Sequence, residues 1–273
     1  MKWTRGTKNS DVIDARGRKT GAVLAGGGVV TALIVFAVMR LTGVDISGVF
    51  GGGNTASSST SQPSEPYKGT AEEEELYDFV EFALGDMQTT FRALFEKQGK
   101  RYENAKLVVF TSAVDSGCGR ASSSIGPFYC PADKHAYIDL SFYQDLRKRF
   151  GAPGDFAQAY VLAHEVGHHL QNLFGVGGSR DNAHSVRVEL QADCYAGIWA
   201  KSAQGKKLLE IGDLEEALTA AAAIGDDRLQ QQAGVEVKPE SFTHGSSQQR
   251  VAWFRRGFEA GTFEACDTFS GEP

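Results

Sequence analysis

The stretch that decides the fold is YVLAHEVGHHLQNLF, residues 160–174, where apolar side chains recur at helical spacing around His164, Glu165 and His168. These three residues form the pattern His-Glu-x-x-His. On a helix, residues four apart share one face, so both histidines can offer nitrogens to one metal ion, with Glu165 beside the first. We expect a structural role for His169, which lies about 100° round the helix from His168. The alternative is a core helix whose histidines are only hydrogen bonded.

A second helix is needed to complete a zinc site, because catalytic zinc usually takes three protein ligands and leaves one position for water. One large class has glycine and histidine at positions 171 and 174, but this chain has Gln171 and Phe174. The segment SVRVELQADCYAGIW instead offers Glu189 as the third ligand and, one turn later, Asp193. We expect Asp193 to accept the ring N–H of a zinc-bound histidine. The alternative is that Glu189 and Asp193 lie on an ordinary solvated helix face.

The segment THGSS, residues 243–247, precedes the last predicted helix. When water attacks a peptide carbonyl, negative charge grows on the oxygen, and a hydrogen-bond donor placed there lowers the barrier. His244 is a candidate for that catalytic donor. The alternative is that Thr243, Ser246 or Ser247 caps the helix and His244 has no role. Arg250 either pairs with a site carboxylate or lies on the surface.

The N-terminal part of the chain predicts a membrane anchor. Basic residues outnumber acidic ones in residues 1–20, and residues 21–39 carry no charge. As a helix, this apolar stretch would span about 28 Å, close to the roughly 30 Å of bilayer hydrocarbon. We therefore expect a basic cytoplasmic tail (1–20), a single transmembrane signal anchor in the cytoplasmic membrane (21–40) and a Gly/Ser-rich tether (41–70). A cleavable signal peptide is the alternative.

The rest of the chain, residues 71–273, predicts one α+β domain, mainly helical with a small sheet and located outside the cytoplasm. Helical patterns cover five segments of the sequence, namely 71–99, 155–174, 180–203, 213–225 and 246–260. The segments KLVVF and AYIDLSF read as strands. The second is a candidate for the edge strand against which an extended peptide substrate pairs, and a plain core strand is the alternative.

The four cysteines, Cys118, Cys130, Cys194 and Cys266, all follow the apolar stretch and allow three disulfide pairings. The short interval from Cys118 to Cys130, rich in Gly, Ser and Pro, closes most easily, and Cys194 would then pair with Cys266. Four free buried thiols are the alternative. The formal net charge of −6 gives no basic surplus, so we expect no nucleic-acid partner.

Four separated blocks of the sequence resemble the bacterial neutral zinc metallopeptidase family: AYVLAHEVGHHLQ, VELQADCYAGIWA, GPFYCPADKHAYIDLSF and FTHGSSQQRVAWFRRGFEAG. The likeness covers nearly the whole chain, from the basic N-terminus to CDTF near the C-terminus. The family is similar to the gluzincins, which implies a zincin-like fold and zinc held by two histidines and a downstream glutamate.

These observations together predict a membrane-anchored zinc peptidase acting on a peptide or protein substrate. Zinc would activate a water molecule, and Glu165 would take its proton and return it to the leaving amine. One rival is a non-catalytic zinc-containing scaffold or binding protein of the cell envelope, in which a fourth protein ligand closes the site. A second rival keeps the hydrolysis but cleaves an amide of cell-wall peptide.

Overall fold

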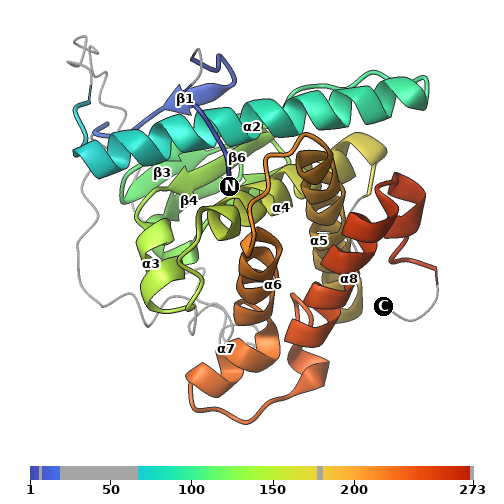
Figure 1. Ribbon diagram of the computed structural model, residues 1–273. Helices are drawn as coiled ribbons and strands as arrows, with labels where there is room; N and C mark the ends of the chain where they lie inside the picture. Colours follow the sequence, from blue (N-terminus) through green and yellow to red (C-terminus); the bar gives the residue numbers. More distant parts are fainter. Residues whose placement is uncertain (6–7, 19–66, 177–180, 271–273) are drawn as a thin grey trace.

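The computed structural model describes residues 1–5, 8–18, 67–176 and 181–270 (Figure 1). The prediction of an α+β fold, mainly helical with a small sheet, is confirmed. Its strands and longer helices are, in chain order, β1 (Val12–Asp14), α2 (Ala71–Lys97), β2 (Lys106–Phe110), β3 (Ala113–Ser116), β4 (Gly119–Ser122), β5 (Phe128–Cys130), β6 (His135–Asp139), α3 (Phe142–Lys148), α4 (Asp155–Phe174), α5 (Asn182–Gly205), α6 (Asp213–Ala223), α7 (Asp226–Gln232) and α8 (Ser247–Ala260).

The ends of the long helices follow from local sequence signals. Thr70 and Glu73 form a capping box at the start of α2, whose first turn is acidic and so complements the helix dipole. The metal-motif helix α4 ends at Gly175, which adopts a left-handed conformation with φ 71° that glycine accepts without strain. All five predicted helices are therefore present, with ends within a few residues of the expected positions.

The main sheet has the order β1-β2-β6-β5, with β1, β2 and β6 parallel and β5 antiparallel to β6. The predicted strand at 106–110 is confirmed as β2. The proposal that residues 137–142 form the edge strand is wrong, because β6 lies between β2 and β5 and the chain turns into α3 at Phe142. The edge on this side is β5, which the sequence did not distinguish from a loop.

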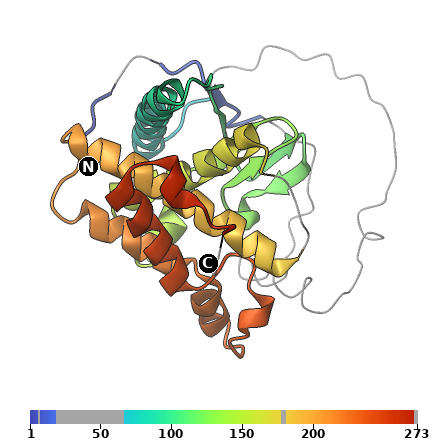
Figure 2. The same cartoon turned by 90° about the vertical axis from the view of Figure 1, so that its right-hand side faces the viewer.

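The layers are arranged around α4. This helix contacts α2, β5 and β6 on one side and α5 and α6 on the other. Figures 1 and 2 show the strands and the C-terminal helix α8 at opposite sides of the domain, with α2 running along the outside of the sheet. The fully buried aromatic side chains Phe91, Tyr160 and Trp199 show that one core connects α2, α4 and α5.

Residues 1–5 and 8–18 pack with the folded domain, and this corrects the predicted basic cytoplasmic tail. Strand β1 pairs with β2 in the register Val12↔Leu107 and extends the main sheet. Met1 is buried, and the Trp3 ring lies 5.4 Å from that of Phe79 on α2. Asp11 accepts a hydrogen bond from Lys106 Nζ at 2.5 Å.

The prediction of a cytoplasmic tail separated from the domain by a single transmembrane helix is therefore wrong. One crossing would place β1 and β2 on opposite sides of a membrane, but the two strands are paired. The predicted tail depended on the basic residues near the N-terminus. One of them, Arg16, is buried in the domain and pairs with Asp14 and Glu74. Within the described ranges, every helix is too short or too polar to cross a bilayer. The predicted span 21–40 and most of the predicted tether, up to residue 66, lie outside the described residues.

Two disulfides are present, with the pairing expected from the sequence. Cys118–Cys130 ties the β3–β4 hairpin to β5, and Cys194–Cys266 ties α5 to the segment after α8. The two Cα atoms are 5.7 Å apart in Cys118–Cys130 and 5.6 Å apart in Cys194–Cys266. No free cysteine remains in the chain, so the alternative of four free thiols is wrong.

Candidate metal centre

Helices α4 and α5 bring His164, His168 and Glu189 together. One nitrogen or oxygen from each of these residues lies within 4.8 Å of the others. Gly167 makes this approach possible, because a Cβ at this position would lie 2.9 Å from the backbone of Ala192 on α5. A glycine between the two histidines therefore lets the second helix come close enough for its carboxylate to reach both rings.

The His164 ring is held at both nitrogens. Its Nδ1 lies 2.9 Å from Asp193 Oδ1, and its Nε2 lies 3.1 Å from Glu189 Oε2. Both carboxylates only accept, so each ring nitrogen can donate in the metal-free protein, and Nε2, which faces the candidate ligand Glu189, is the nitrogen available to a metal. Burial would lower the pKa of His164, but Asp193 and Glu189 outweigh it and raise this pKa to about 10. A metal ion must therefore displace a proton to bind here.

Asp193 is itself the centre of a buried network, as the sequence suggested. Arg250 donates to both carboxylate oxygens, from Nε at 2.8 Å and from Nη2 at 3.0 Å. The Tyr160 hydroxyl donates to Oδ1 at 2.5 Å. Burial would raise the pKa of Asp193, but Arg250 and His164 outweigh it and lower this pKa. Arg250 thus pairs with a site carboxylate and does not lie on the surface.

The His168 ring has a different support. Its Nδ1 lies 2.8 Å from the amide oxygen of Gln171, and its Nε2 lies 3.5 Å from Glu189 Oε1. Sequence reasoning missed this role of Gln171, although its place three residues after His168, on the same helix face, was an available signal. His168 and His164 thus present the same kind of nitrogen, Nε2, to Glu189.

Two glutamates at the site have opposite electrostatic surroundings. For Glu189, burial would raise the pKa, but His168 and His164 outweigh it and hold this pKa well below its usual range. For Glu165, burial is the dominant influence and raises the pKa, with the two histidines opposing it. Glu189 is therefore suited to be an ionised ligand, and Glu165 to exchange a proton.

His244 lies at the start of α8 with its side chain 40% exposed. Its Nδ1 is 3.1 Å from Asp226 Oδ1, and Asp226 Oδ2 also accepts the backbone N–H groups of Thr243 and His244, each at 2.7 Å. Ser246 makes the helix cap, together with Gln249. Capping therefore does not require His244, and Asp226 leaves its Nε2 free. The sequence did not single out Asp226, because α7 itself was not predicted.

His169 has the structural role expected of it. Its Nδ1 lies 3.1 Å from the Tyr129 hydroxyl and its Nε2 lies 2.8 Å from the carbonyl oxygen of Glu103. Burial lowers the pKa of His169, which favours the neutral ring. The side chain therefore ties edge strand β5 to α4 and is turned away from the three metal-site donors.

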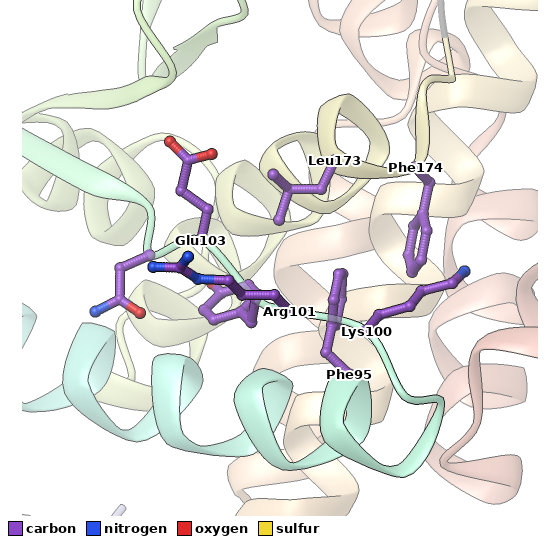
Figure 3. A pocket seen from close by; sticks show the side chains of 8 residues that line it. Phe95, Lys100, Arg101, Glu103, Leu173 and Phe174 are labelled. Carbon is purple, nitrogen blue, oxygen red and sulfur yellow. The ribbon is translucent and has the colours of Figure 1, made fainter.

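Two other features differ in chemistry from this centre. Asp155, Asp213 and Glu216 also gather within 4.8 Å, but this cluster has no histidine and contacts the amino group of Met1. A cavity of about 940 Å³ lies between the end of α2 and the end of α4. Figure 3 shows Phe95, Arg101 and Leu173 around it, and its lining includes none of the three candidate ligands.

An α+β fold with two histidines from one helix facing a carboxylate from the next has the architecture of a metallohydrolase. Comparison of the sequence specifies the class further. The chain belongs to the family described as "Putative neutral zinc metallopeptidase", whose sequence profile matches residues 1–269. The matched residues include β1, which pairs with β2.

Similar proteins occur in Escherichia coli and in Mycobacterium tuberculosis. YpfJ of Escherichia coli (strain K12) is 45% identical over 289 aligned positions, which cover 98% of this chain and 99% of that protein. Rv2575 of Mycobacterium tuberculosis is 48% identical over 186 positions, covering 62% of this chain and 64% of that protein. Neither name states an activity. No solved structure matches the chain.

Proposed function

We propose that this protein is a zinc-dependent peptidase whose metal ligands are His164, His168 and Glu189. The observation that carries the proposal is the convergence of these three donors within 4.8 Å, with the Nδ1 atoms of both rings already held by other side chains. Two neutral imidazoles and one carboxylate are a usual donor set for catalytic zinc. The family supports the same metal, because its description names zinc.

Different residues of this chain have different roles in the proposed hydrolysis. Bound zinc would supply Lewis acidity and make water a better nucleophile near neutral pH. Glu165, whose pKa is raised by burial, accepts the proton of the attacking water and returns it to the leaving amine. His244, fixed by Asp226, donates from Nε2 to the oxygen on which negative charge develops. Edge strand β5 offers backbone groups to an extended peptide.

A non-catalytic zinc scaffold would need a fourth protein ligand. Within the described residues, the cluster contains three donor residues and no fourth. Asp193 is engaged by Arg250 and by the Nδ1 side of His164, while His169 contacts Tyr129. A set of three protein donors, which is typical of catalytic zinc, therefore favours the peptidase over the scaffold.

The two disulfides support a location outside the cytoplasm, because reducing cytoplasmic conditions disfavour stable disulfides. We propose a peptide or protein substrate in that compartment.

The decisive experiment measures zinc content and cleavage of an unbiased peptide library by the full chain, beside the Glu165→Gln variant. We expect about one zinc per wild-type chain and a loss of roughly 10²–10⁴-fold in turnover for Glu165→Gln, with zinc retained, because the general base is removed and no ligand is.

Glu96→Gln, which alters an exposed glutamate on α2, is the matched control and should cleave as the wild type does. Full activity of Glu165→Gln with zinc bound would refute the proposed mechanism. Zinc in both proteins with cleavage in neither would favour the scaffold, and absence of metal from the wild type would remove the basis of both.

A further inference from the structure

The side-chain amide of Gln171 has only one possible orientation. Its Nε2 lies 2.6 Å from the backbone carbonyl of Val188, which can only accept, so the amide nitrogen must face that side. The amide oxygen therefore faces His168 Nδ1 at 2.8 Å. Because that oxygen can only accept, Nδ1 carries the hydrogen and His168 Nε2 is left facing Glu189.

A second buried glutamine holds the first. Gln191, on α5, accepts a hydrogen bond from Gln171 Nε2 at 3.2 Å and donates from its own Nε2 to the backbone carbonyl of Cys266 at 2.9 Å. Both glutamines are nearly inaccessible, with exposed fractions of 3% and 6%. Cys266 is covalently fixed to Cys194, so the last acceptor in this series belongs to a rigid part of the chain.

The two candidate histidine ligands thus depend on chemically different supports. His164 is oriented by the charged pair Asp193–Arg250. His168 is oriented by neutral amides that end at a backbone carbonyl. Hydrogen bonds to neutral amides are weaker than charge-assisted ones, so the second support relies on both glutamines being held in place.

We propose that Gln171, held by Gln191, is a positioning residue that fixes His168 for metal binding. The inference rests on the proposed zinc site and goes beyond it by assigning the His168 orientation to an amide series linked to the Cys194–Cys266 disulfide. Groups that orient a metal-bound histidine typically change metal affinity by about 10–100-fold when removed.

The test is the dissociation constant for zinc, measured by chelator competition on the full chain, together with the visible spectrum of the cobalt-substituted protein. Gln171→Leu removes both hydrogen-bonding ends and should weaken zinc binding by about 10–100-fold. Gln171→Glu keeps an acceptor for His168 but places a carboxylate oxygen against the Val188 carbonyl and Gln191 Oε1, so it should recover only part of the affinity. Gln191→Leu leaves the His168 contact in place and should give a smaller loss, of several-fold.

The matched control is Gln88→Leu on α2. Gln88 is also buried with both amide ends used, donating to the Ala105 carbonyl at 2.7 Å and accepting from the Tyr102 hydroxyl at 2.6 Å. This variant should lose stability yet bind zinc as the wild type does, which separates positioning from a general effect of losing a buried amide.

Wild-type zinc affinity and an unchanged cobalt spectrum in a folded Gln171→Leu protein would overturn the proposal. If that variant does not fold, Gln191→Leu decides in its place, and unaltered affinity there would overturn it equally. Failure of the proposed function is distinguishable, because zinc affinity is measured without peptidase activity. If the wild type binds zinc but cleaves no peptide, the peptidase proposal fails and the positioning role of Gln171 still stands. If the wild type binds no metal, both proposals are refuted.

Discussion

The contact between α4 and α5 and the contact between β1 and β2 both join parts of the chain that local sequence does not connect. In the first, His164 Nε2 lies 3.1 Å from Glu189 Oε2, within the proposed metal site. In the second, Val12 pairs with Leu107 through the sheet backbone. Metal chemistry imposes particular residue types and can be read from the sequence, whereas a strand of three residues such as β1 is too short for its pattern to show.

The comparison also has an energetic side. The α4–α5 contact contains the pairs of His164 with Glu189 and with the buried Asp193, and Asp193 is in turn paired with Arg250 of α8. The β1–β2 contact is held by backbone hydrogen bonds and partly exposed polar groups such as Lys106. We therefore expect substitutions at the first contact to affect stability and metal binding together. Substitutions at the second should affect stability alone.

The largest effect is expected for Arg250→Met, which leaves the Asp193 carboxylate buried without its cation. The free energy of unfolding should fall by about 3–5 kcal/mol, since an uncompensated buried charge costs that much. Zinc affinity should fall as well, because Asp193 orients His164. Denaturant unfolding of the metal-free proteins and chelator competition measure the two effects.

Arg255→Met, at an exposed position on the same helix, is the control and should change stability by less than about 0.5 kcal/mol. Equal stabilities of the two variants would show that the buried pair contributes nothing net.

The second effect is expected for the double variant Cys194→Ala with Cys266→Ala. The lost disulfide closes a longer segment of chain than Cys118–Cys130, with sequence separations of 72 and 12. Chain-entropy arguments give about 4 kcal/mol for the longer loop and about 3 kcal/mol for the shorter one. Comparing the two double variants by denaturant unfolding tests this order, and the reverse order would mean that strain or denatured-state structure dominates.

The smallest effect is expected at β1. Asp11→Ala removes the acceptor for Lys106 Nζ at 2.5 Å and Asn104 Nδ2 at 2.6 Å, and should cost about 1–3 kcal/mol. Zinc affinity should not change. Asp115→Ala, at an exposed position of β3, is the control. A loss of zinc affinity in Asp11→Ala would contradict the separation of the two contacts.

The sequence predicted the helices because each has a long apolar period, and α4 and α6 begin at the expected residues. It predicted that Glu189 would lie beside His164 and His168, because His-Glu-x-x-His is incomplete as a zinc site without a further ligand. It did not predict β1, β5 or α7, which have three, three and seven residues and too few positions for a period to show.

The supporting residues of the site were harder to predict than its donors. Gln171 and Gln191 are ordinary polar residues until the fold places their amides in a buried series. Asp226 lies on α7, and its contact with His244 depends on how α7 packs at the start of α8. Such partners are set by tertiary packing and not by spacing along the chain.

The position of β1 in the sheet has a consequence for the order of events during synthesis. Val12 leaves the ribosome about 95 positions ahead of its partner Leu107, a delay of roughly 5–20 s at ~5–20 residues per second. A three-residue strand has no stable structure alone, so it waits for β2. We therefore expect β1 to join the sheet only after β2 has been synthesised, although β1 itself is made first.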